Sequence, residues 1–321
     1  MILFSDLHLK PESAETCFSV LDAILSLAKA RGEKVIAFLG DFWHVRYSVP
    51  VDLLNRVDAE LDRWMKEGIE EVILLPGNHD QINVAGENAL KILERAYPEA
   101  GRVEVYDEPI EDAHGLWLPY RKDPMQIVER IVNVPHSAKR AFIHHGLVGA
   151  QMNTGIAAGE LDGIHPGHLV SFQTVFFGHW HRHQVLGNCV YVGSPWQTKA
   201  DEAGQQKGVI VLDEKTGAWE FVPLTVGKKY IRATTAAEAA QAKAGDTVRL
   251  PYDCPQDIVN GLLKRGIEAR VDPPPFVPTT ARLGLDKNTP MRAYAERYVE
   301  AQHGDLDKSI LMQIFDEVSH G

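Results

Sequence analysis

The sequence predicts an α/β fold, and three observations support that prediction. Short runs rich in Val, Ile and Phe recur through the first half of the 321-residue chain. Segments with apolar residues at helical spacing separate these runs, as in proteins whose helices cover a sheet. Apolar residues make up 45% of the chain, which is enough to fill a large core. We therefore expect a globular protein of about two domains.

The expected strands of the first half are short and apolar, and they span residues 2–4, 35–39, 72–75, 141–143 and 175–177. Two amphipathic helices lie between the first three strands. Their apolar faces are formed by Phe18, Leu21, Leu25 and Ala28 in one helix and by Leu54, Val57, Leu61, Trp64 and Met65 in the other. Further along, residues 189–192, 209–212 and 219–222 are strand-like runs separated by short turns that contain glycine. These runs predict an antiparallel sheet that closes the domain.

The composition changes after Leu224 and predicts two smaller parts. Residues 225–272 alternate between strand-like and helical segments, with helices expected at 236–244 and at about 256–265, and they predict a small α/β cap. A proline-rich stretch beyond the cap predicts an extended linker. Two amphipathic helices should follow, with stripes formed by Met291, Tyr294, Ala295, Tyr298 and Val299 and by Ile310, Leu311, Ile314, Phe315 and Val318. The predicted domains are 1–224, 225–272 and 273–321.

Charge and cysteine content exclude several classes of protein. The chain has 33 Lys and Arg against 44 Asp and Glu, so its net charge of -11 disfavours a protein that coats nucleic acid with a broadly basic surface. A phosphate-bearing partner would need local positive charge, such as bound metal. The three cysteines form neither a disulfide framework nor a C-x-x-C pattern. With no signal peptide and no membrane-spanning run, the sequence predicts a cytoplasmic protein without a membrane partner.

Five polar clusters each follow one of the predicted strands of the first half. They are Asp6-Leu7-His8, Gly40-Asp41-Phe42-Trp43-His44, Gly77-Asn78-His79-Asp80, Ile143-His144-His145-Gly146 and Gly178-His179-Trp180-His181. Open α/β folds place their sites at the carboxyl ends of the strands, so we expect all five clusters at one edge of the sheet.

The residue types in these clusters predict a metal centre. In extended chain, residues i and i+2 point the same way, so Asp6 with His8 and His179 with His181 each direct two donors to one place. Carboxylate, imidazole and amide donors suit Mn²⁺, Fe²⁺, Co²⁺ or Zn²⁺. A single D-x-H or G-D occurs by chance in most chains, and a lone histidine is more often structural than a ligand. Five clusters in this order offer more donors than one ion needs, which favours two ions about 3.5 to 4 Å apart.

The order D-x-H, G-D, G-N-H-D, H and G-H-x-H resembles that of the calcineurin-like metallophosphoesterase superfamily, over residues 1 to about 225. The resemblance implies a four-layer αββα sandwich with a small C-terminal α/β cap and terminal helices. It also implies roles for single residues. Asp6, His8 and His181 would hold one metal, Asn78, His144 and His179 the other, and Asp41 would bridge them. His144 is preferred to His145, but the doublet leaves both open. His79 would act on the substrate phosphate. Apart from the resemblance, we expect the adjacent Asp80 to orient His79.

Further features are similar to the nuclease subunits of SbcCD-type DNA repair complexes. His44, three residues after Asp41, resembles an extra histidine that orients the phosphodiester in several of these nucleases, although many bacterial members carry Asp there. The cap resembles their DNA-capping domain, and the terminal helices lie where the family binds the coiled coil of an SMC-like (SbcC-type) ATPase. The resemblance implies a homodimeric DNA exonuclease and endonuclease of repair and recombination. Two divalent ions, expected to be Mn²⁺, would activate a bridging water for attack on phosphorus.

Contacts with DNA would depend on local basic and aromatic residues, for which we consider Arg46, Tyr47, Arg182 and His183 together with Trp43, Trp180 and Trp196. Two other functions stay open. One is a stand-alone phosphoesterase for cyclic nucleotides or other small phosphate esters. The other is a non-catalytic scaffold that binds partners, against which the intact donor motifs argue.

Overall fold

The computed structural model describes residues 1–44, 48–83, 85–97, 101–133, 136–152, 155–274, 290–300 and 308–319. Two residues considered for DNA contact, Arg46 and Tyr47, lie outside the described residues. The chain divides into a large unit, Met1–Val271, and a small one, Asp272–Gly321.

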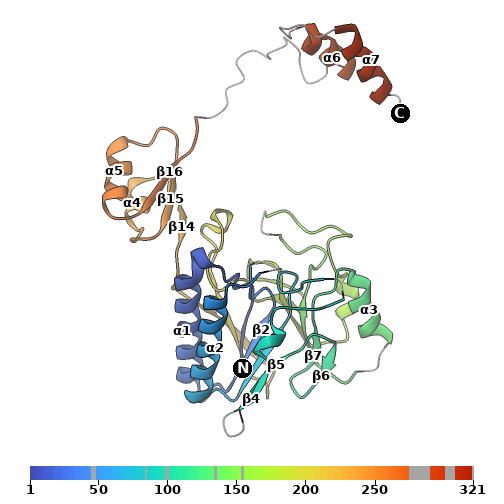
Figure 1. Cartoon of the computed structure of the whole chain (residues 1–321), viewed down its shortest axis with the longest axis vertical. Coiled ribbons are helices and arrows are strands. Elements are labelled where there is room, and N and C mark those ends of the chain that lie inside the picture. The colour runs from blue at the N-terminus through green and yellow to red at the C-terminus, as the bar shows by residue number, and fades with distance from the viewer. Residues whose placement is uncertain are drawn as a thin grey trace. The chain divides into compact units, whose positions relative to one another are not determined.

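The first sheet of the large unit has seven strands in the described residues, in the order β13-β12-β1-β2-β3-β5-β4. Their bounds are β1 Ile2–Phe4, β2 Val35–Leu39, β3 Glu71–Leu75, β4 Arg95–Tyr97, β5 Gly101–Val105, β12 Gly208–Leu212 and β13 Trp219–Pro223. Strands β1, β2, β3 and β5 are parallel, whereas β12 runs antiparallel to β1. Helices α1 (Ala14–Arg31) and α2 (Val51–Lys66) cover one face of this sheet (Figure 1).

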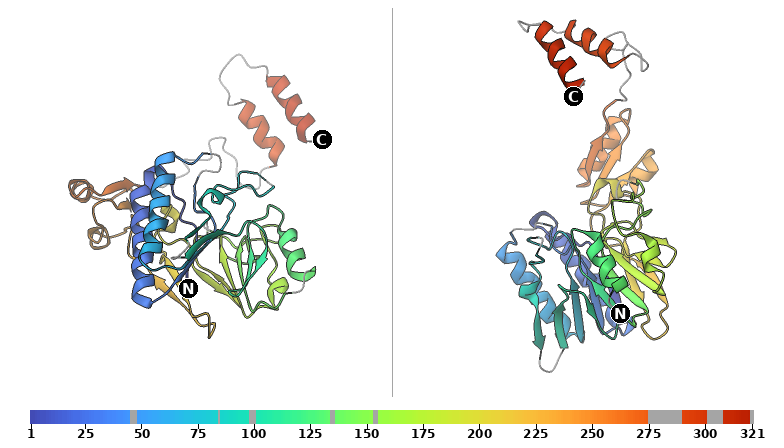
Figure 2. Two further views of the ribbon diagram at one scale, coloured as in Figure 1. Left: turned by 60° about the horizontal axis from the view of Figure 1, so that its bottom comes forward. Right: turned by 90° about the vertical axis from the view of Figure 1, so that its right-hand side faces the viewer.

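The second sheet has the order β10-β11-β9-β8-β7-β6. Its strands are β6 Ile110–Glu111, β7 Leu116–Leu118, β8 Arg140–His144, β9 Thr174–Gly178, β10 Gln184–Leu186 and β11 Cys189–Tyr191. Helix α3 (Pro124–Asn133) packs on its outer face. Figure 2 shows α3 and the pair α1 and α2 on opposite sides of the two sheets.

Alternation along the strands explains why the two sheets pack face to face. In β2, Ile36 and Phe38 pack with α1 and α2, while Ala37 and Leu39 pack with residues of the second sheet. The shared layer between the sheets contains Trp117, whose ring stacks on Phe142 at a centroid distance of 4.0 Å. The central strands β1, β2, β3, β8 and β9 are buried on both faces, so these runs are largely apolar. The structure confirms the predicted four-layer α/β sandwich.

The predicted closing sheet of residues 189–222 is wrong in its pairing. Strand β11 pairs in parallel with β9 in the second sheet, while β12 and β13 extend the first sheet. All three runs are short and apolar, and nothing local to them specifies which sheet they join. The structure also adds β4 to β7 and α3, in a region for which the sequence analysis named no element.

The cap contains a three-stranded sheet in the order β14-β15-β16, with strands Tyr230–Arg232, Thr247–Leu250 and Glu268–Val271. The strands are parallel because helices α4 (Ala236–Ala240) and α5 (Gln256–Lys264) connect them. Helix α4 begins with a capping box formed by Thr235 and Glu238, but it ends before the predicted Ala244. Asp246 accepts the amide of Lys243 at 2.8 Å, which fixes a turn where the helix was expected to continue.

The small unit contains helices α6 (Met291–Glu300) and α7 (Lys308–Ser319), which pack against each other. Both helices lie where the sequence predicts them. Across the described parts of both units, every helix is too short or too polar to cross a lipid bilayer.

Candidate metal centre

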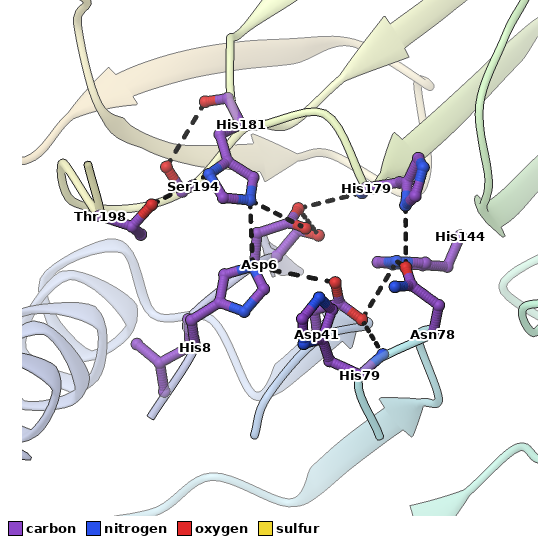
Figure 3. A network of polar contacts seen from close by, with 12 residues as sticks. Asp6, His8, Asp41, Asn78, His79, His144, His179, His181, Ser194 and Thr198 are labelled. Atoms are coloured by element: carbon purple, nitrogen blue, oxygen red, sulfur yellow. Dashed lines mark hydrogen bonds and ion pairs between the residues drawn. The ribbon is translucent and has the colours of Figure 1, made fainter. Parts of the chain in front are cut away.

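The five clusters meet at the carboxyl ends of strands from both sheets (Figure 3). Loops after β1, β2 and β3 of the first sheet supply Asp6, His8, Asp41, Asn78 and His79, and the ends of β8 and β9 in the second supply His144, His179 and His181. The predicted site therefore spans the edges of two sheets, because the sheets pack with these strand ends side by side.

One group of donors consists of Asp6, His8 and His181, whose ligand atoms all lie within 4.8 Å of one another. The Nε2 atoms of His8 and His181 are 3.0 Å apart. Oδ1 of Asp6 lies 3.9 Å from Nε2 of His181. All three side chains are buried.

The second group consists of Asp41, His144 and His179, which satisfy the same distance condition. Asn78 joins them, with its Oδ1 atom 3.3 Å from Nε2 of His144 and 2.9 Å from Nδ1 of His179. Of the histidine doublet, His144 lies in this group of donors. The ring of His145 instead lies between the carbonyls of Gly146 and Arg121.

Asp41 lies between the two groups. Its Oδ2 atom is 3.8 Å from Nε2 of His8, and its Oδ1 atom is 3.4 Å from Nε2 of His144. One carboxylate thus reaches both donor sets, which is the geometry a bridging ligand needs.

The backbone is strained at the residues that carry these donors. The non-glycine residues with positive φ in the described parts of the chain are Asp6, His8, Asp41 and His179, with φ of 54°, 50°, 62° and 98°. Such conformations cost roughly 1–3 kcal/mol each and persist where the surrounding structure enforces them. Gly77 leaves space for this packing, since a Cβ atom there would lie 2.2 Å from Oδ1 of Asp41. The strained backbone therefore lowers the stability of the fold, and it directs these side chains towards one another.

Electrostatic interactions within the cluster set its protonation. Burial would raise the pKa of Asp41, but the charge and hydrogen bond of His144 lower it well below the ordinary range. Burial alone would lower the pKa of His144, and Asp41 raises it to about 9. Burial and the neighbouring His144 lower the pKa of His179 to about 3. His179 is therefore neutral and Asp41 ionised near neutral pH, as metal ligands must be, while a bound cation would displace the proton of His144.

The donors fit a pair of divalent ions on two further grounds. Oδ1 of Asp6 is buried and has no hydrogen-bond partner, which is costly unless a cation faces it. The set mixes carboxylate, imidazole and amide oxygen, as intermediate divalent ions prefer.

Two imidazole rings are oriented by acceptors on Nδ1. Nδ1 of His144 donates a hydrogen bond to the carbonyl oxygen of Leu39 at 2.6 Å. His181 is held by the buried carboxylate of Glu202, also at 2.6 Å. Glu202 is not among the residues predicted from the sequence, because an acidic residue in a surface-like Ala-Asp-Glu-Ala run carries no local signal of this contact.

His44 and His79 lie beside the first group. Nδ1 of His79 donates to the backbone carbonyl of His44 at 2.9 Å, and the two rings stack with an interplanar angle of 16°. Nδ1 of His44 lies 3.4 Å from Nδ1 of His8. Both rings line a cavity of about 280 Å³, together with Lys10 and Lys199.

The hydrogen-bond partners of Asp80 differ from the predicted partner, His79. Its buried carboxylate accepts the backbone amides of Asp41, Trp43 and Gly77 and makes no hydrogen bond to the ring of His79 in the described structure. The loops after β2 and β3 are therefore held together by Asp80, while the carbonyl of His44 orients His79.

Arg182 and His183, also considered for DNA contact, lie outside the cavity at the donors. Arg182 is exposed and donates to Gln151, whereas the ring of His183 stacks on Phe221 at 4.1 Å and bonds the carbonyl of Tyr191. Trp43 is buried and packs within the protein, whereas Trp180 and Trp196 line the cavity at the donors. His183 and Trp43 are thus structural, and they are not free to stack on bases.

Comparisons with known proteins identify the family of this chain. Residues 1–183 match the family model described as calcineurin-like phosphoesterase. Exonuclease subunit 1 of Enterobacteria phage T4 is 30% identical over 192 residues, which are 57% of this chain and 54% of that protein. The chain thus spans about half the length of the curated relative it matches.

Solved structures give looser likenesses. The protein TT1561 of Thermus thermophilus shares 14% identity with a TM-score of 0.37, over 69% of this chain and 97% of that one. A novel archaeal phosphodiesterase shares 10% identity with a TM-score of 0.36, over 70% and 98%. The family match covers more than half of this chain and includes every candidate metal ligand. The chain belongs to the calcineurin-like phosphoesterase family.

Proposed function

We propose that the protein is a two-metal-dependent DNA nuclease that serves as the SbcD-like subunit of a repair or recombination complex. The observation that carries the proposal is the placement of Asp41 between two complete donor groups, with His79 beside them. The proposed ligands are Asp6, His8 and His181 for one ion, Asn78, His144 and His179 for the other, and Asp41 for both. We expect Mn²⁺ at both positions.

Bound ions of this kind polarise the phosphate and lower the pKa of water at the site. The protein supplies the rest. His79 has Nδ1 engaged by the carbonyl of His44, which leaves Nε2 for a phosphate oxygen or the leaving 3′ oxygen. His44, stacked on His79 at the same cavity, would orient the phosphodiester.

Local positive charge supports a nucleic-acid substrate. Lys10 and Lys199 line the cavity beside the donors. A neighbouring cavity of about 530 Å³ shares Trp196 with it and is lined by Lys228, Lys229 and Arg232, with no Asp or Glu among its described lining residues. A phosphate backbone longer than one nucleotide would therefore meet cations beyond the metal centre, despite the net charge of -11.

The partner proposal depends on the relative and on the small unit. The matched phage protein is named as an exonuclease subunit, which implies assembly with other chains. Exposed Met291 and Tyr298 on α6 and Ile310 on α7 leave apolar surface on the helix pair. We propose that this pair binds an SMC-like ATPase of SbcC type, and that the nuclease acts as a homodimer in the cytoplasm with both exonuclease and endonuclease activity.

One observation favours a second candidate, a phosphoesterase for cyclic nucleotides or other small esters. The cavity at the donors measures only about 280 Å³, close to the lower end of the range for small-molecule sites. The third candidate, a non-catalytic scaffold, does not explain why strained backbone maintains the donor groups.

The deciding experiment incubates the purified protein with Mn²⁺ and either labelled duplex DNA or a chromogenic small diester. We expect cleavage of DNA, lost in Asp41→Asn, which excludes a contaminating nuclease. Turnover of the small diester alone would favour the second candidate. Binding of Mn²⁺ with turnover of neither substrate would favour the third candidate, a non-catalytic scaffold.

A further inference from the structure

A buried pair of opposite charges, Glu202 and Lys207, contacts the candidate ligand His181. Glu202 at the end of a short 3₁₀ helix (Ala200–Glu202) is fully buried, and Lys207 just before β12 is 6% exposed. We propose that Glu202, held in place by Lys207, is a positioning residue that fixes the ring of His181 and sets the affinity of the first metal position. The inference rests on the proposed role of His181 as a ligand.

The contacts of Glu202 determine which ring nitrogen faces the site. Its Oε1 atom lies 2.6 Å from Nδ1 of His181. The hydroxyl of Thr198 lies 3.1 Å from the same nitrogen and donates to the same carboxylate oxygen at 2.7 Å. A carboxylate can only accept, so Nδ1 carries the proton and Nε2 keeps its lone pair. That Nε2 atom is the one near Asp6 and His8, and Figure 3 shows Thr198 beside the opposite edge of the ring.

Lys207 holds the same ligand from a second side. Its Nζ atom donates to Oε2 of Glu202 at 2.9 Å, to the backbone carbonyl of His181 at 2.7 Å and to the hydroxyl of Ser194 at 2.9 Å. One ammonium group therefore fixes both the main chain of His181 and the carboxylate that orients its side chain. Two buried charges cost free energy by desolvation, and such pairs are weak contributors to stability. A role in orienting a ligand explains why the fold keeps them.

The two metal positions differ in this respect. In the second group, Nδ1 of His144 donates to a neutral backbone carbonyl, that of Leu39. An anionic acceptor makes the opposite ring nitrogen a stronger donor than a neutral acceptor does. Loss of Glu202 should thus weaken one metal position and leave the other intact, which distinguishes positioning from a general loss of structure.

The test uses the full-length protein, Mn²⁺ alone as probe, and the variant Glu202→Gln. Titration calorimetry and Mn²⁺ electron paramagnetic resonance, which counts free ion, should find two sites in the wild type. In Glu202→Gln, one site should bind about 10- to 100-fold more weakly and the other should be unchanged. Activity should need more Mn²⁺ for half-saturation, with kcat largely recovered at saturating metal.

The matched control is Glu214→Gln. Glu214 also accepts from a half-buried histidine, His114, but it follows β12 beyond Leu212, at the edge of the sheet opposite Asp6. We expect both Mn²⁺ affinities to be unchanged in this control. If Glu202→Gln does not fold by circular dichroism, Thr198→Val removes the hydroxyl that bridges ring and carboxylate and should weaken the same site to a smaller degree.

Equal Mn²⁺ affinities at both sites of the folded Glu202 variant, or of Thr198→Val when only that variant folds, would overturn the inference. So would equal weakening in Glu214→Gln. Failure of the proposed function has a different signature, because the wild type itself would then bind no pair of Mn²⁺ ions or cleave no phosphodiester.

Discussion

The carboxylate of Asp80 accepts the backbone amide of Asp41 at 2.8 Å, and it also accepts the amides of Trp43 at 3.0 Å and Gly77 at 2.9 Å. In return, Oδ1 of Asp41 accepts the amide of His79 at 2.8 Å. These reciprocal bonds join the loops after β2 and β3. The proposed bridging ligand is therefore positioned by a residue that is not itself one of the proposed ligands.

This arrangement predicts that Asp80→Asn destabilises the protein. An amide in place of the carboxylate loses acceptor capacity and leaves buried amide donors unpaired, which costs about 1–3 kcal/mol of unfolding free energy. Urea denaturation measures the change. The control is Asp213→Asn, since Asp213 also accepts backbone amides, those of Lys215 and Thr216, but at an exposed turn. An Asp80 variant no less stable than the Asp213 variant would contradict the prediction.

His79→Gln should separate catalysis from metal binding. We expect kcat on DNA to fall about 10²- to 10⁴-fold, the usual contribution of a general acid or base, with Mn²⁺ affinity unchanged. The control is His168→Gln, which alters an exposed histidine outside the five clusters and outside the cavity lining, and it should leave kcat unchanged. Normal kcat in His79→Gln would show that this ring takes no part in the reaction.

Charge reversal at the second cavity should distinguish a nuclease from a small-ester phosphoesterase. The double variant Lys229→Glu, Arg232→Glu should weaken DNA binding and reduce the slope of log affinity against log salt by about 2, because about two phosphate contacts are lost. Hydrolysis of a small diester should be unchanged. Lys243→Glu, Lys264→Glu makes the same charge change at exposed cap positions outside that cavity and serves as control. Equal loss of DNA binding in both pairs would indicate only long-range charge repulsion.

Added Mn²⁺ should raise the melting temperature of the wild type. An ion that binds only the folded state stabilises it by about 2.7 kcal/mol per site at a hundredfold excess over Kd. Asp41→Asn removes the carboxylate between the two groups and should lose most of this gain. Calorimetric scans with Mn²⁺ and with a chelator measure the difference, and a wild type indifferent to Mn²⁺ would contradict the metal centre.

The sequence predicted that the donor clusters lie together because each cluster follows an apolar strand, so local pattern and fold point to the same edge. It could not predict contacts that depend on distant chain segments. The carboxylate of Glu202 reaches His181 from 21 positions away, and β11 joins the second sheet only because β9 lies there. Proximity in sequence favours a contact between Asp80 and the ring of His79, but the amides that Asp80 accepts lie mostly on the loop after β2.

The histidine His114 offers a test of stability against pH away from the metal centre. Burial alone would lower the pKa of His114, but its hydrogen bonds to Glu214 and Glu71 raise it to about 10. In the unfolded chain the value is about 6.5. Between these values the folded state binds more protons than the unfolded state, so the contribution of His114 is complete below about pH 6.5 and is lost as pH rises towards 10.

The variant His114→Gln should therefore remove this pH dependence. The unfolding free energy of the wild type minus that of the variant should decline from pH 6.5 to 10, by at most about 1.4 kcal/mol per pH unit. Urea denaturation at half-unit intervals measures this difference, and subtracting the variant cancels the titration of all other groups. A difference that stays constant over this range would show that His114 is already neutral beside Glu71 and Glu214, so that the contact is a neutral hydrogen bond and not an ion pair.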